Sequence, residues 1–218
     1  MDNNEAKILT DRIFKLIRDS ETIEDLIFIE KEEFENKFRM DSKVYPKIEF
    51  DIKPSDLNEL EKKGFLETDF NFKENITKKI KDPLTKLLYS LAWKNGDLNK
   101  LKHIAKGISE FEKDIHDQED AFVFYQFGKY LTKTDGQPII DQHVIRAFSV
   151  YITNDMADIS RFRKLGTITK NEKEKISKYI EWLKSNEISK NLKSIKDYSY
   201  YIDKILFATG KKIKTKKN

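Results

Sequence analysis

Apolar residues recur at intervals of three and four along most of this 218-residue chain, which is the spacing of one face of an α-helix. The clearest stretch follows Asp82, a residue suited to capping a helix, and Pro83, which suits the first helical turn. Its apolar stripe consists of four leucines, Leu84, Leu87, Leu88 and Leu91. We therefore predict a mainly α-helical protein.

Other segments carry helix signals of similar strength. Asn95 and Gly96 separate the leucine helix from a second helix that starts after Asp97, so the two are expected to form a helical hairpin. Residues 118–131 place apolar side chains nearly all round a helix, which predicts the most buried helix of the chain. Further helices are predicted from three signals, namely Asp141 as an N-cap, a capping box at Thr169 and Glu172, and Gly210 as a C-terminal stop.

One stretch in the N-terminal third departs from helical spacing. Apolar and charged residues alternate between Val44 and Pro54, and Pro46 and Pro54 bracket the alternation. This pattern is typical of a strand with one buried face, and the prolines favour the edge of a sheet. We therefore predict a small β element here, then a helix from Pro54 that Gly64 ends, and an extended piece over residues 65–72.

The change from mixed to wholly helical spacing near residues 73–82 predicts the domain organisation. We expect a mixed helical region with short strands over residues 1–80, a helical domain over 81–210, and a basic tail over 211–218. The tail lysines either remain solvated or contact phosphates, and they are Lys211, Lys212, Lys214, Lys216 and Lys217.

The composition excludes several classes of protein. Because there is no cysteine, the chain has no disulfides, no cysteine-ligated zinc or iron–sulfur site and no thiolate catalysis. The three histidines lie far apart in the sequence, so no metal or cofactor is expected. No signal peptide is recognisable, and no apolar run approaches the ~20 residues that cross a bilayer. We expect a cytoplasmic protein without a membrane partner.

One run of residues carries a lead to function. Residues 138–148 read PIIDQHVIRAF, in which an extended piece delivers Asp141, followed by His143 and Arg146, to the start of a helix. This run resembles the active-site segment of the helix-hairpin-helix DNA glycosylases. A weaker likeness extends the comparison to roughly residues 84–150, where LLYSLAWKNGD resembles the early helical hairpin beside the family's DNA cleft.

The resemblance implies an N-glycosidic bond hydrolase that acts on DNA or recognises a nucleobase. Asp141 would be the catalytic carboxylate that stabilises positive charge on the sugar during bond cleavage. The lysine of strand-cleaving members falls near Glu119 or Asp120, so no lyase activity is implied. The residues expected to contact DNA are His143, Arg146, Lys94 and Asn95 within the resemblance, together with Lys211, Lys212 and Lys214 of the basic tail.

The same residues also allow hypotheses without catalysis. An aspartate before an amphipathic helix is an ordinary N-cap. The chain would then be a non-catalytic helical subunit of a bacterial complex that binds a protein partner, or a DNA-binding accessory protein. The surroundings of Asp141 distinguish the hypotheses: a pocket with basic or aromatic neighbours favours the divergent glycosylase, and a helix cap on a flat surface favours the interaction protein.

Overall fold

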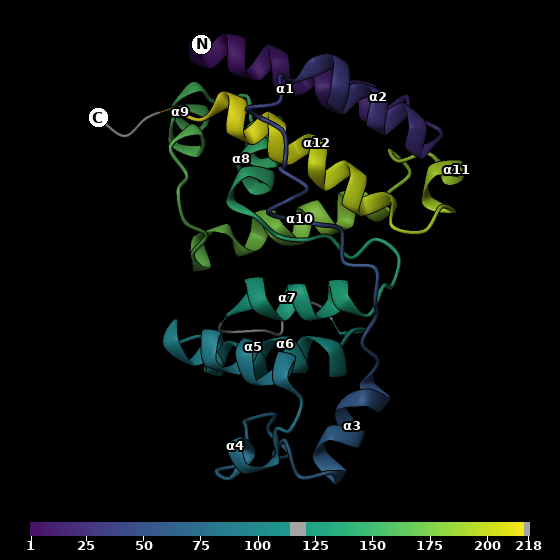
Figure 1. The fold of residues 1–218 in the computed structure, drawn as a ribbon. Helices are drawn as coiled ribbons and strands as arrows, with labels where there is room; N and C mark the ends of the chain where they lie inside the picture. The colour runs from purple at the N-terminus through teal and green to yellow at the C-terminus, as the bar shows by residue number, and fades with distance from the viewer. Residues whose placement is uncertain (114–120, 216–218) are drawn as a thin grey trace. The chain divides into compact units, whose positions relative to one another are not determined.

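The computed structural model describes residues 1–113 and 121–215, and its named elements in those residues are all helical (Figure 1). The prediction of a mainly α-helical protein is confirmed. The chain divides into two compact units: the first unit is Met1–Glu49 with Asp135–Asn218, and the second unit is Phe50–Thr134. The predicted boundary near residue 80 falls within the second unit. None of the helices in the described part of the chain is long and apolar enough to span a membrane.

The first unit is built around two helices, α8 and α12, that pack on each other. Gly210 lies where they cross, because a Cβ there would come within 1.9 Å of the backbone oxygen of His143. The helices of this unit are α1 (Asn3–Arg18), α2 (Ile23–Glu33), α8 (Gln142–Tyr151), α9 (Met156–Arg163), α10 (Lys173–Lys184), α11 (Lys190–Lys193) and α12 (Tyr198–Ile213). A 3₁₀ turn over Lys170–Glu172, capped by Thr169, leads into α10 as the capping box predicted.

Aromatic side chains from three helices form the core beneath α8. The ring of Phe14 in α1 stacks on Tyr151 at 3.9 Å between centroids and meets Trp182 of α10 at 4.9 Å. Phe148 of α8 lies against the ring of Tyr179 at 5.2 Å. The buried faces of α1, α8 and α10 therefore meet in one aromatic cluster.

The second unit centres on a close helix pair, α6 and α7. A Cβ at Gly107 would lie 1.9 Å from the backbone oxygen of Tyr125, and one at Gly128 would lie 2.0 Å from that of Ile104, so both glycines allow the two backbones to approach. Helix α5 precedes α6 across the turn at Gly96, as the hairpin prediction requires. The helices of this unit are α3 (Pro54–Lys62), α4 (Ile76–Lys79), α5 (Pro83–Lys94), α6 (Leu98–Ser109) and α7 (Phe122–Leu131).

The predicted β element is wrong. The segment from Val44 to Pro54 forms no strand, and the backbone N–H of Ile52 donates instead to the oxygen of Leu131 at the end of α7, at 3.0 Å. Alternation along one segment supplies no second strand to pair with, and each bracketing proline removes a backbone donor. Within the described residues, strand-like pairing is limited to one isolated bridge, between Leu66 and Phe72.

The C-terminal helix extends further than predicted. Gly210 does not end α12, which continues to Ile213, a fully buried residue. The first three residues of the expected basic tail therefore belong to the folded first unit. Residues 216–218 lie outside the described part of the chain, as do residues 118–120 at the start of the predicted buried helix, whose described part is α7.

Candidate functional site

Asp141 caps helix α8. Its backbone is extended, and its side chain accepts a hydrogen bond from the backbone N–H of His143 at 2.6 Å. The extended segment before it is held by Asp203 of α12, whose carboxyl accepts from the N–H of Ile139 at 2.8 Å. The predicted N-cap is confirmed, and the carboxylate is half-buried at the first turn of the helix.

Arg146 lies in the interior of the first unit and has no exposed surface. Its guanidinium donates to the backbone oxygen of Gly210 at 2.8 Å and to that of Leu165, so it joins α8 to α12 and to the residues that follow α9. Burial lowers the pKa of Arg146 to about 10. The structure therefore gives Arg146 a structural role, and the expected contact with DNA phosphates is corrected because the side chain does not reach the surface.

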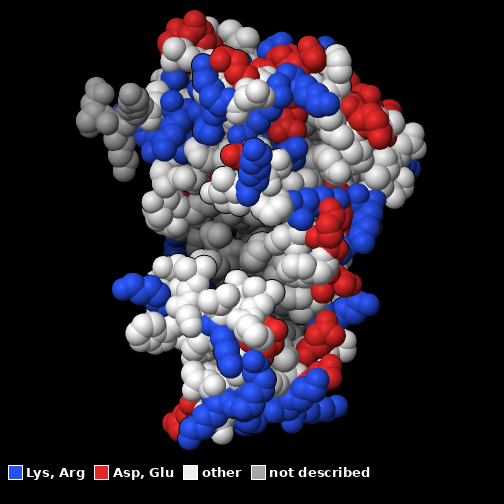
Figure 2. All heavy atoms as spheres, in the orientation of Figure 1, with Lys and Arg blue, Asp and Glu red and all other residues white. Residues whose placement is uncertain are grey.

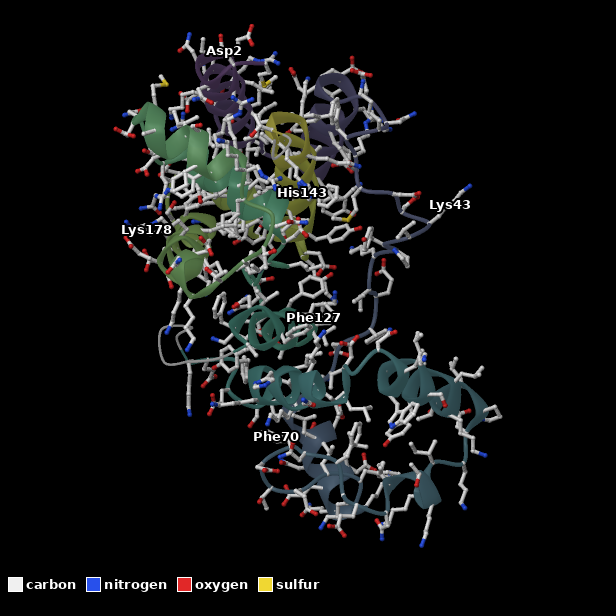
Figure 3. The ribbon with its side chains drawn as sticks, turned by 90° about the vertical axis from the view of Figure 1, so that its left-hand side faces the viewer. Asp2, Lys43, Phe70, Phe127, His143 and Lys178 are labelled. Atoms are coloured by element: carbon white, nitrogen blue, oxygen red, sulfur yellow. The ribbon has the colours of Figure 1, made fainter. Side chains whose placement is uncertain are left out.

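His143 belongs to the first turn of α8, and its ring faces α12 (Figure 3), where it meets Phe207 edge-on at 4.8 Å. Its Nδ1 lies 2.5 Å from a guanidinium nitrogen of Arg146, so Nδ1 accepts this hydrogen bond in the neutral ring. Burial lowers the pKa of His143, and the charge of Asp141 opposes that change. The imidazole is therefore neutral at pH 7 and positioned by the fold, and it supplies no positive charge for a phosphate.

Asp203 is a buried acidic residue that the sequence analysis did not identify. Its carboxyl accepts from the hydroxyl of Tyr179 at 2.5 Å, and burial raises the pKa of Asp203 to about 8, with a contribution from Asp141. The only sequence signal is its place on α12 beside the apolar positions Ile202 and Ile205. Because it is 2% exposed and its oxygens face the protein, it serves to hold the segment before Asp141.

The remaining predicted DNA contacts fall in different places. Lys211 and Lys214 are exposed, and Lys214 is close enough to His143 to lower the pKa of that residue. Lys212 is bound within the protein, because its ammonium donates a hydrogen bond to the backbone oxygen of Glu33 at 3.2 Å. Lys94 and Asn95 are exposed at the end of α5, in the second unit.

Comparison of the chain with protein-family models, curated proteins and solved structures finds no match. The glycosylase resemblance is therefore still a prediction. Its catalytic-lysine position, near Glu119 or Asp120, lies outside the described residues. Among the residues that the structure does describe, no group of three or more histidine and acidic side chains is placed to hold a metal ion.

Helix α5 is the most unusual surface of the second unit. It has no buried residue, although an apolar stripe like its four leucines usually faces the core in a water-soluble protein. Figure 2 shows a white surface in the region where Figure 1 places α5, with Lys side chains gathered toward α4. The stripe exposes large apolar side chains at 63% for Leu84, 69% for Leu87, 57% for Leu88 and 59% for Leu91.

A surface pocket of about 680 Å³ lies on the other side of α5. Its aromatic walls are Tyr89 and Trp93, and the ring of Tyr89 is held by an edge-on contact with Phe72 at 5.6 Å. The remaining lining residues are polar, basic or aliphatic, and they are Thr77, Ile80, Lys86, Ser90 and Lys94. Lys94 is thus the one predicted DNA-contacting residue that lines this pocket.

Proposed function

We propose that this protein is a non-catalytic interaction subunit that inserts helix α5 into an apolar groove of a protein partner. The exposure of the leucine stripe on α5 carries the proposal. A contiguous exposed apolar surface of this kind is typical of an interaction site in a water-soluble domain. Two residues of the first unit also support a non-catalytic role, because Asp141 caps a helix and the side chain of Arg146 is buried.

The free energy of α5 supports the same proposal. A helix of 12 residues is marginally stable in water unless it packs on something, and no residue of α5 is buried. Covering the exposed area of the four leucines would contribute roughly 4–7 kcal/mol before the cost of association, at about 1.5–3 kcal/mol for a fully covered leucine. Binding to a partner would therefore bury the leucines and stabilise the helix at the same time.

The spacing of the stripe favours a protein groove. Leu84, Leu87, Leu88 and Leu91 stand at positions i, i+3, i+4 and i+7, which is the anchor pattern of a helix bound in a hydrophobic groove. Nucleic acid has no apolar groove that would cover four leucine side chains. The partner that fits this surface is a folded protein with a groove about two helical turns long.

The experiment is purification of the tagged full chain from its own cells, followed by light scattering on a size-exclusion column. We expect the wild type to elute in a complex with a second protein at fixed stoichiometry. The Leu87→Ser/Leu91→Ser variant should elute as a free monomer. A matched control, Ile8→Ser/Phe28→Ser, removes two side chains that are 59% and 64% exposed in the first unit, and it should retain the complex.

Three results would contradict the proposal. The wild type could elute as a monomer, or both double variants could retain the same complex. The third is leucine-dependent sedimentation of the chain with vesicles of phosphatidylcholine and phosphatidylglycerol, because a membrane surface would then be what covers α5.

A further inference from the structure

The pocket between α4 and α5 has the chemistry of a second binding site. Tyr89 and Trp93 supply two aromatic faces, and Trp93 is 66% exposed. Lys86 and Lys94 supply positive charge at the same pocket. Because a helix has 3.6 residues per turn, Lys86, Tyr89 and Trp93 lie on the side of α5 opposite the leucine stripe. A ligand held by these three residues leaves the leucines uncovered, and Lys94 lies at the edge of the pocket near Leu87.

The lysines around the pocket are available to a ligand. Lys86 and Lys94 are exposed, and neither forms an ion pair with a described residue. The same holds for Lys78 of α4 and for Lys81, which are exposed but do not line the pocket. Residues 73–106 as a whole hold nine lysines and three acidic residues, whereas the complete chain has a net charge of only +4. The segment that contains the pocket therefore carries an excess of positive charge, and two of its lysines line the pocket itself.

We propose that this pocket binds single-stranded nucleic acid, with a base stacked on Trp93 or Tyr89 and the strand's phosphates beside Lys86 and Lys94. Aromatic faces within a positively charged groove are the combination by which proteins hold single strands without reading their sequence. The pocket is lined by two lysines and two aromatic rings, so it offers more than one phosphate contact and more than one stacking face. This pairing of contacts favours a strand over a free nucleotide.

The test measures fluorescence anisotropy of a labelled oligothymidine strand titrated with the full chain at several salt concentrations. We expect binding that weakens with salt. The Lys86→Gln/Lys94→Gln variant should flatten the logarithmic salt slope by about 1.4, at ~0.7 for each phosphate contact with a single strand. The matched control is Lys164→Gln/Lys196→Gln, which removes the same charge from two exposed lysines of the first unit and should leave the slope unchanged.

Substitution of Trp93 tests stacking separately from charge. Trp93→Ala should weaken binding by about 5-fold or more, and Trp93→Phe should restore part of the loss. Binding of unlabelled strand should also quench tryptophan emission, because the other tryptophan, Trp182, is buried at 5% exposure and contributes a constant background.

Four results would overturn the inference. One is the absence of any anisotropy change at low salt. Another is an equal change of the logarithmic salt slope in the Lys86→Gln/Lys94→Gln variant and in its control. The third is competition by thymidine monophosphate as effective as that by the strand, which would make the ligand a nucleotide. The fourth is tighter binding of an acidic, aromatic peptide than of the strand, which would assign the pocket to a protein. None of these results depends on whether the leucine stripe binds its partner.

Discussion

Replacement of Arg146 by Met should destabilise the first unit strongly. The guanidinium satisfies the backbone oxygens of Gly210 and Leu165 inside the protein, and a methionine side chain fills much of the same volume without any donor. Leaving a buried acceptor unpaired costs about 1–3 kcal/mol. Because these two oxygens and the Nδ1 of His143 all lose their donor, the free energy of unfolding should fall by about 2–5 kcal/mol, allowing for the apolar gain from methionine and for the partial exposure of His143.

The assay is urea unfolding of the full chain followed by the emission of Trp182, which lies in the core of the first unit. Arg161→Met is the matched control, because Arg161 is exposed and makes only surface contacts, an ion pair with Asp158 at 2.7 Å and a contact with the ring of Phe162, so its loss should cost under about 1 kcal/mol. Equal stability of Arg146→Met and wild type would refute the structural role of Arg146 and revive the expected contact with DNA.

Three further substitutions test the first unit. Burial raises the pKa of Asp203 in the folded protein to about 8, so between about pH 4 and 8 the carboxyl is protonated in the folded protein and ionised in the unfolded chain. The free energy of unfolding should therefore fall as pH rises through this window, by at most about 1.4 kcal/mol per pH unit. Urea unfolding of Asp203→Asn should not show this pH dependence. Gly210→Ala should cost about 1–3 kcal/mol in thermal unfolding and Gly166→Ala little, since the added Cβ meets an oxygen at 1.9 Å in the first and at 3.9 Å in the second. Asp141→Ala should lower the free energy of unfolding by about 0.5–2 kcal/mol, because the helix loses its N-cap. The wild type, incubated with oligonucleotides that carry damaged bases, should produce no abasic sites. Abasic sites made by the wild type and not by Asp141→Asn would instead support the glycosylase hypothesis.

Helix caps and turns could be predicted from the sequence, because their causes lie within a few residues. Asp141 precedes an apolar helical pattern, and an aspartate there can bond the free N–H groups of the first turn whatever lies around it. The turn at Gly96 and the capping box at Thr169 were predictable for the same reason. Each depends on residues at most a few positions apart.

The errors concern residues whose partners are distant in the sequence. Gly210 was predicted as a helix end, but its role is to let α12 cross α8 at His143. Arg146 stands on a helix like any surface arginine, and only the fold shows that the oxygens of Gly210 and Leu165 enclose it. The alternation after Val44 likewise marks a strand only if another strand lies beside it.

The leucine stripe on α5 also separates what is predictable from local sequence from what depends on distant partners. Helical spacing predicts which side of α5 is apolar, and this part was right. Spacing does not predict what covers that side, and in the described structure Leu87 is 69% exposed. We therefore propose that this exposed stripe is a contact surface for another molecule.

The most direct test of the proposed function is site-specific photo-crosslinking in the cells of origin. A photoreactive benzoylphenylalanine replaces Leu88 of the stripe in one variant and Ile8 of the first unit in the control; both positions are exposed. We predict one adduct with a second protein from position 88, lost on adding Leu84→Ser/Leu91→Ser, and no such adduct from position 8. An adduct only within the same chain, or the same adducts from both positions, would contradict the claim that α5 binds a protein partner.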